Sequence, residues 1–198
     1  MARRTRAEME ETRATLLATA RRVFSETGYA DTSMDDLTAQ AGLTRGALYH
    51  HFGDKKGLLA AVVGQIDAEM DARLRAISDA AENPWQGFQN RCEAYLQMAL
   101  EPEIQRLVLR DARAVLGPAS PEAQRCCVES MQRLIDDLMT QGMVAEADSE
   151  ALASLIYGSL SEGAFWIAEG DQGVDRLGHA VRALRLLLRG MLVEPDKT

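Results

Sequence analysis

The sequence predicts an all-α protein made of two domains. Apolar residues recur at helical spacing along the chain, and the first example is Leu16, Ala20, Val23 and Phe24. No stretch shows the strict alternation that is typical of a half-buried strand. Glycine, proline and small polar residues divide the 198 residues into about nine segments of helical length. A hydrophobic content of 46% and a charged content of 26% are ordinary for a globular protein with an apolar core.

The first four predicted helices have clear start and stop signals. Gly28 supplies a left-handed stop to the first helix. Ser33 is a good N-cap for the second helix, and Gly42 ends it. Thr44 caps the third helix, and Asp54 caps the fourth. The predicted ranges are 7–27, 34–41, 45–52 and 55–80.

Five more helical patterns lie between the proline and glycine breaks of the remaining chain. Their predicted ranges are 85–100, 102–116, 121–143, 149–169 and 174–193. No flexible linker is recognisable, so the fourth helix is expected to join the two domains directly. We therefore divide the chain into an N-terminal three-helix domain, residues 1–54, and a C-terminal helical domain, residues 55–198.

The charge of the chain is unevenly distributed. The net charge is −8, yet residues 1–56 carry nine basic and eight acidic side chains and are close to neutral. The excess negative charge therefore lies in the C-terminal part. This asymmetry permits the N-terminal part to approach phosphate groups, whereas the C-terminal part repels them.

Several functional classes are not favoured by the sequence. The longest apolar stretches are interrupted by Arg, Glu or Ser, and acidic residues follow the basic start, so we expect a cytoplasmic protein without a membrane partner. No nucleophile–base pair, metal cluster or phosphate loop is recognisable, so we expect neither an enzyme nor a bound cofactor or metal. Cys126 and Cys127 are open to two interpretations, a thiol sensor or two small, partly buried residues.

Residues 34–52 have the spacing of a helix-turn-helix. Two eight-residue helices flank the turn Gly42-Leu43-Thr44, and Leu37, Leu43 and Leu48 are expected to point inward and hold the two helices together. The second helix is then free to present its first turn to the major groove of DNA.

The residues around this motif sharpen the prediction. Residues 18–59 read ATARRVFSETGYADTSMDDLTAQAGLTRGALYHHFGDKKGLL. This segment resembles the DNA-binding signature of the TetR family: a helix ending in F-x-x-x-G-Y, then T-S, A-G-L-T, L-Y-x-H-F and K-x-x-L. Thr38 departs from the pattern, because the family usually has Ala there. The resemblance covers about a fifth of the chain.

The resemblance implies a dimeric bacterial transcription regulator. Its N-terminal helix-turn-helix domain, residues 1–54, would bind double-stranded operator DNA, and residues 55–198 would bind an effector and form the dimer. The most common mode in such a family is repression that a small molecule relieves. A helical interaction scaffold that does not bind DNA is the rival interpretation, and the segments L-Y-H-H-F and K-K-G-L-L argue against it.

Candidate DNA contacts follow from the chemistry and the resemblance together. The planar fork of Arg45 suits the two acceptors of guanine, and Ala47 suits a thymine methyl group. Tyr49 and Lys55 are similar to the family's phosphate-binding tyrosine and lysine, although a tyrosine here is also compatible with a core role. The predicted DNA-binding residues are Ser33, Met34, Thr44, Arg45, Gly46, Ala47, Tyr49, His50 and Lys55.

The C-terminal domain offers candidate ligand contacts. Aromatic residues form a stripe on the helix 85–100, and Asp111 stands on an otherwise apolar stripe, where it needs a partner. That partner is either a ligand or a neighbouring arginine, Arg110 or Arg113. Core aromatics and an internal salt bridge are the alternative. The predicted ligand-binding residues are Trp85, Phe88, Tyr95, Asp111, Tyr157 and Phe165, for a mainly apolar small molecule.

The last two predicted helices suit a dimer interface. Helix 149–169 is rich in Ala, Ser and Gly, which let helices approach closely, and helix 174–193 has a wide Leu face. In the TetR family such a pair forms a four-helix bundle with the same pair of a second subunit. We therefore expect a homodimer through 149–169 and 174–193, with a purely internal core as the alternative.

Overall fold

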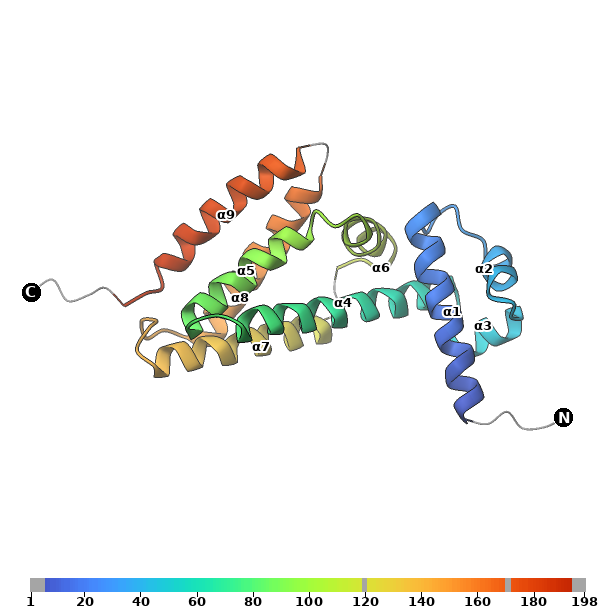
Figure 1. The fold of residues 1–198 in the computed structure, drawn as a ribbon, viewed down its shortest axis with the longest axis horizontal. Coiled ribbons are helices and arrows are strands. Elements are labelled where there is room, and N and C mark those ends of the chain that lie inside the picture. The colour runs from blue at the N-terminus through green and yellow to red at the C-terminus, as the bar shows by residue number, and fades with distance from the viewer. Residues whose placement is uncertain (1–5, 119–120, 170–171, 194–198) are drawn as a thin grey trace, which may run out of the picture. The chain divides into compact units, whose positions relative to one another are not determined.

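A computed structural model describes residues 6–118, 121–169 and 172–193 of the chain (Figure 1). The all-α prediction is confirmed, since the described residues form helices joined by short turns and a single isolated β-bridge, Val144 to Leu192. The helices are α1 Arg6–Thr27, α2 Met34–Ala41, α3 Arg45–Phe52, α4 Lys55–Asp79, α5 Pro84–Met98, η1 Ile104–Ala112, α6 Arg113–Leu116, α7 Pro121–Thr140, α8 Ser149–Ala168 and α9 Gly173–Arg189.

Three helices differ clearly from their predicted form, and one of them is α7, which ends at Thr140 rather than at residue 143. The predicted helix 102–116 is present, but its middle, η1, is a π-helix that continues directly into α6. The last helix ends at Arg189 rather than at residue 193. It ends there because the chain beyond it pairs with the turn after α7: Ala145 donates to the carbonyl of Met191, and Val193 donates to the carbonyl of Met143.

The described chain forms two compact units. The first, which we call the HTH unit, combines residues 6–69 with residues 102–118. The second, the bundle unit, combines residues 70–101 with the described residues of 121–193. The predicted functional division after residue 54 remains a prediction. The compact units do not follow it, because residues 55–69 of α4 and residues 102–118 cluster with α1, α2 and α3.

The core of the HTH unit is formed by the predicted stripe on α1. Leu16, Ala20, Val23 and Phe24 are buried, and α1 contacts both α2 and α3. Leu37 of α2 and Leu48 of α3 are buried as well. Full burial of one such side chain contributes about 1.5–3 kcal/mol, so these few residues hold the two short helices in place.

The bundle unit is organised around α8. This helix packs against α5, α7 and α9, and Ala153, Ile156, Leu160 and Ala164 lie on its buried face. A bidentate ion pair joins α5 to α9: Arg185 donates from Nε and Nη2 to the carboxylate of Glu93 at 2.7 and 2.6 Å. Glu93 is buried and its pKa is lowered by this hydrogen bonding. Within the described part of the chain, no helix is long and apolar enough to cross a membrane.

Candidate DNA-binding surface and its contacts

The helix-turn-helix is held by capping interactions that the sequence predicts. The Ser33 hydroxyl accepts a hydrogen bond from the N–H of Asp36 at 3.0 Å at the start of α2. Gly42 adopts the left-handed conformation, with φ of 65°, and ends this helix. The Thr44 hydroxyl then accepts from the N–H of Ala47 at 3.2 Å, so that α3 begins at Arg45. These contacts fix where each of the two helices begins.

Six of the nine predicted DNA contacts lie at the starts of α2 and α3, and all nine are at least partly exposed. Leu48 is buried, while Tyr49 on the next position of the same helix is 47% exposed. Tyr49 is therefore not a core aromatic residue. The other predicted contacts are also exposed or half-buried, and these are Ser33, Met34, Thr44, Arg45, Gly46, Ala47, His50 and Lys55.

Lys55, at the start of α4, is held by its own unit. Its Nζ lies 4.3 Å from the centroid of the Tyr29 ring and donates to the carbonyl of Ala30 at 3.4 Å. Partial burial lowers the pKa of Lys55, and the nearby carboxylates of Asp31 and Asp111 counteract that shift. The ammonium group is thus positioned rather than freely solvated.

Arg45 has a partner that the sequence did not indicate. Its Nε lies 3.2 Å from the Oδ1 atom of Asp35, which stands in the first turn of α2. From the sequence, Asp35 has only the favourable position of an acidic residue near a helix N-terminus. The ion pair depends on how the turn brings the two helix starts together, and no sequence spacing signals it.

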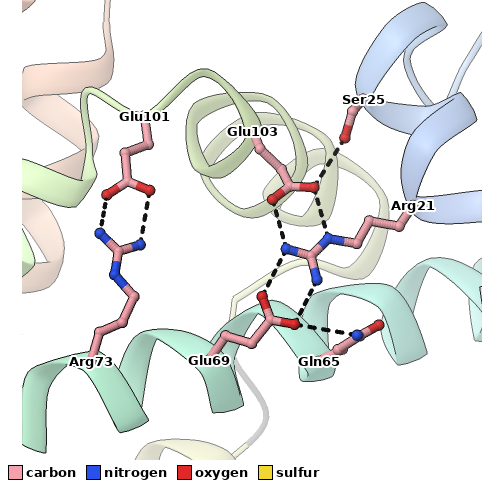
Figure 2. Close-up of polar contacts among 7 residues, drawn as sticks. All are labelled: Arg21, Ser25, Gln65, Glu69, Arg73, Glu101 and Glu103. Carbon is pink, nitrogen blue, oxygen red and sulfur yellow. Dashed lines mark hydrogen bonds and ion pairs between the residues drawn. The ribbon is translucent and has the colours of Figure 1, made fainter. Parts of the chain in front are cut away.

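A second polar cluster joins α1 and α4 to the segment around η1 (Figure 2). Arg21 of α1 donates to both carboxylate oxygens of Glu69 on α4, at 2.6 and 2.8 Å. The same guanidinium donates twice to Glu103, directly before η1, at 2.8 Å each. Hydrogen bonds from Arg21 lower the pKa of both Glu69 and Glu103. One arginine therefore joins three segments of the HTH unit.

Two further residues of the η1 segment bind the end of α1. Arg106 donates from Nη1 to the carbonyls of Ser25 and Glu26 at 3.3 Å, which satisfies acceptors that a helix end leaves free. Asp111 accepts from the backbone N–H of Tyr29 at 2.9 Å. The sequence indicated neither of these contacts, because the carbonyls that accept from Arg106 and the N–H that donates to Asp111 belong to the backbone.

The predicted ligand contacts do not all share a unit. Trp85, Phe88 and Tyr95 lie on α5, and Tyr157 and Phe165 lie on α8, which packs against α5 in the bundle unit. Phe88 is buried, and its ring centroid lies 6.2 Å from that of Trp85.

Asp111 belongs to the HTH unit, whereas the other predicted ligand contacts belong to the bundle unit. Its carboxylate accepts a hydrogen bond from the Tyr29 N–H, whereas the sequence suggested a ligand, Arg110 or Arg113. A backbone group thus supplies one partner of this half-buried carboxylate, and its role as a ligand contact stays a prediction.

The predicted dimer helices carry most of the exposed large apolar side chains in the described chain. Val174, Leu186 and Leu187 on α9 are 75%, 74% and 62% exposed. Leu155 and Trp166 on α8 are exposed too. A groove of about 310 Å³ runs between the two helices, with Gly163, Ala183 and Leu187 among its lining residues.

Comparisons with known proteins agree with these features. Residues 16–62 match the family described as bacterial regulatory proteins, tetR family, and residues 85–191 match the tetracyclin repressor-like C-terminal domain. An exposed recognition helix on a capped helix-turn-helix, followed by a helical domain, defines a DNA-binding regulator of this class. The chain belongs to the TetR family.

Individual relatives cover nearly the whole chain. A crystal structure of a TetR-family transcriptional regulator from Pectobacterium atrosepticum is 80% identical, with a TM-score of 0.92 over 98% of this chain and 100% of that chain. The transcriptional regulator CymR of Pseudomonas putida is 30% identical over 80% of each chain. The transcriptional repressor BepR of Brucella suis is 24% identical over 96% of each. The structure of RolR with resorcinol shares the fold at 21% identity, with a TM-score of 0.72 over 96% of this chain and 92% of that chain.

Proposed function

We propose that this protein is a ligand-responsive repressor that binds operator DNA as a homodimer and releases it when a small molecule binds. The observation that carries the proposal is the exposed face of α3, where Arg45 and Gly46 of the first turn and Tyr49 of the second are exposed on a helix fixed by buried Leu48. A helix presented in this way enters the major groove. The action is binding rather than catalysis, and its expected place is the cytoplasm.

The predicted contacts divide into two classes. Arg45 reads guanine through its two acceptors, N7 and O6, and Met34, Gly46, Ala47 and His50 border the same base edges. Tyr49 and Lys55 bind phosphates, as do the free N–H groups at the helix starts marked by Ser33 and Thr44. Base contacts set sequence preference, whereas phosphate contacts set affinity for every sequence.

The dimer forms through α8 and α9. Exposed Leu155, Leu186 and Leu187 lie on these two helices, and an apolar surface of this kind is unusual on a monomer. Two helix-turn-helix motifs must meet half-sites roughly 34–36 Å apart, or a multiple of this distance, so dimerisation is needed for specific binding.

The effector is a mainly apolar small molecule, bound among the aromatic residues of α5 and α8. The support is the aromatic set Trp85, Phe88, Tyr95, Tyr157 and Phe165 on two helices that pack together. RolR, which shares the fold, is known with the aromatic compound resorcinol bound. An effector shifts the equilibrium only if it binds one state more tightly than the other, and operator DNA must weaken effector binding by the same factor.

The η1 segment is the proposed route by which the effector acts on DNA binding. Residues 102–118 lie within the match to the family's C-terminal domain, yet they pack in the HTH unit. Glu103, Arg106 and Asp111 all bind α1 or the turn that follows it. A movement of this segment therefore changes the support of the helix-turn-helix.

A selection from randomised duplex DNA with the full-length protein tests the proposal. We expect a sequence with two related half-sites to be enriched, and a gel shift on it to show dimer binding. Arg45→Ala changes the selected sequence, whereas Tyr49→Phe weakens binding to all sequences alike. If no sequence is enriched, the protein is a helical scaffold rather than an operator-binding regulator.

A further inference from the structure

We propose that Asp35 is a positioning residue for Arg45, so that the pair, and not Arg45 alone, sets the base preference of the operator. The inference rests on the proposed DNA-binding function and adds a second residue to it. It starts from the ion pair between the Arg45 Nε and Asp35 Oδ1 atoms, which are 3.2 Å apart.

The two helix starts that carry this pair are fixed by other contacts. Ser33 caps α2 two residues before Asp35, and Thr44 caps α3 directly before Arg45. The N–H of Leu43 in the turn donates to the carbonyl of Thr38 at 3.0 Å. The backbone is thus set independently of the ion pair, and the pair decides only where the exposed side chains lie.

The geometry suits guanine reading. A guanidinium group offers donors along two edges, and the carboxylate of Asp35 stands at the Nε edge. The two Nη groups remain for N7 and O6 of a guanine. Arg45 is 56% exposed, and a long exposed side chain loses rotamer freedom when it docks. A carboxylate that already restrains it lowers this cost for the oriented contact.

A purely electrostatic role of Asp35 predicts a different result. The Asp35 side chain is 69% exposed at the surface that we propose faces the DNA, so its charge opposes DNA binding in general. Removing the charge then strengthens binding to every sequence and leaves the preference unchanged. A positioning role predicts that the preference falls while the general affinity rises.

Asp36 provides a matched control. It is the next residue in the same helical turn and is also exposed, but its Oδ2 accepts from the Ser33 hydroxyl at 2.6 Å. Asp35→Asn and Asp36→Asn each remove one negative charge from the same turn and keep the size of the side chain. Thermal unfolding checks that both variants remain folded.

The experiment is a selection from randomised duplex DNA, followed by affinity measurements on duplexes that differ at the guanine position assigned to Arg45. We expect Asp35→Asn to lower the preference for guanine about 3- to 10-fold, a typical coupling between contacting residues. Asp36→Asn is expected to leave the preference unchanged. In an Arg45→Ala background, Asp35→Asn should have no further effect on the preference for guanine.

The outcomes separate the inference from the function on which it rests. If Arg45→Ala changes the preference but Asp35→Asn behaves as Asp36→Asn does, Asp35 is not a positioning residue, and the role of Arg45 stands. If Arg45→Ala leaves the preference unchanged, base reading by Arg45 is wrong. If Asp35→Asn still lowers the preference in the Arg45→Ala background, Asp35 acts on a base itself, which also overturns the positioning role.

Discussion

The carboxylate of Asp111 accepts a hydrogen bond from the backbone N–H of Tyr29, with 2.9 Å between Oδ2 and the nitrogen. Tyr29 lies two residues after the end of α1, and Asp111 lies in the last turn of the π-helix η1. The bond therefore ties two segments that are 82 residues apart in the chain. It holds the turn between α1 and α2, on which the position of the helix-turn-helix depends.

Replacing Asp111 by Ala should loosen that turn. We expect faster hydrogen exchange in peptides containing the Tyr29 N–H, together with a loss of about 1 kcal/mol in the free energy of unfolding, as for one half-buried hydrogen bond. Asp111→Asn keeps an acceptor oxygen and should show a smaller effect on exchange. Unchanged exchange at Tyr29 in Asp111→Ala would show that the bond does not hold the turn.

The Arg21 cluster should contribute more to stability than an exposed ion pair. Arg21→Gln removes the shared partner of Glu69 and Glu103, and we expect a loss of about 1–2 kcal/mol, between the values for exposed and buried pairs. Arg6→Gln is the matched control, because Arg6 forms an exposed pair with Glu10 on the same helix. Urea unfolding of both variants at pH 7 measures the difference.

The same cluster predicts a pH dependence. Hydrogen bonds from Arg21 lower the pKa of Glu69 and Glu103 in the folded state, so the unfolded chain takes up protons first on acidification. The stabilisation is present above the ordinary glutamate pKa of about 4.3 and is lost as the pH falls below it. The difference between wild type and Arg21→Gln should therefore shrink from pH 5 to pH 3. A constant difference would contradict the cluster's role.

Charge placed on the exposed Leu face of α9 should produce monomers. Leu187→Glu is expected to leave the fold intact, because Leu187 is largely exposed, and to abolish both dimerisation and operator binding. Leu184 is only 6% exposed, so Leu184→Glu is expected to unfold the chain instead. Met9→Glu, on α1, is a control for an added charge at an exposed apolar residue. Sedimentation velocity at micromolar concentration gives the oligomeric state of each protein. A wild-type protein that is monomeric under these conditions would refute the interface.

The three cysteines should differ in reactivity. Cys126 and Cys127 are exposed, whereas Cys92 is 1% exposed and burial raises its pKa to about 12. A thiol reagent at pH 8 should therefore modify two thiols quickly in the native protein and the third only in denaturant. Three fast thiols would show that Cys92 is accessible.

Cys92 also has a consequence for alkaline stability. The folded state disfavours its thiolate, so its contribution to stability is complete below the unfolded pKa of about 8.5 and decreases as the pH rises above that value. In Cys92→Ala this alkaline loss should be smaller, which urea unfolding at pH 8 and pH 10 would measure.

The helices were predictable because their signals are local. Ser33 and Thr44 form the caps that the sequence indicates, and Gly42 takes the left-handed conformation expected of a helix stop. The buried stripe of α1 follows directly from its helical spacing. Local chemistry thus determines where each element of the helix-turn-helix begins and ends.

The connections between distant segments were not predictable. In the sequence, Arg21 is one more charged residue of an exposed helix face. Its partner Glu103 lies 82 positions away, so no local pattern indicates the pair. Asp111 pairs with a backbone N–H, and a sequence carries no sign of which backbone group is unsatisfied. The π-helix was not predictable either, because the apolar spacing between residues 102 and 116 was compatible with an ordinary α-helix.

The π-helix has a consequence for how the chain length varies among relatives. A π-turn closes its hydrogen bond one residue later than an α-turn, so η1 holds more residues in each turn than an ordinary helix does. Deletion of one residue between positions 103 and 111 is therefore absorbed by a return to α-helix, with no loop broken.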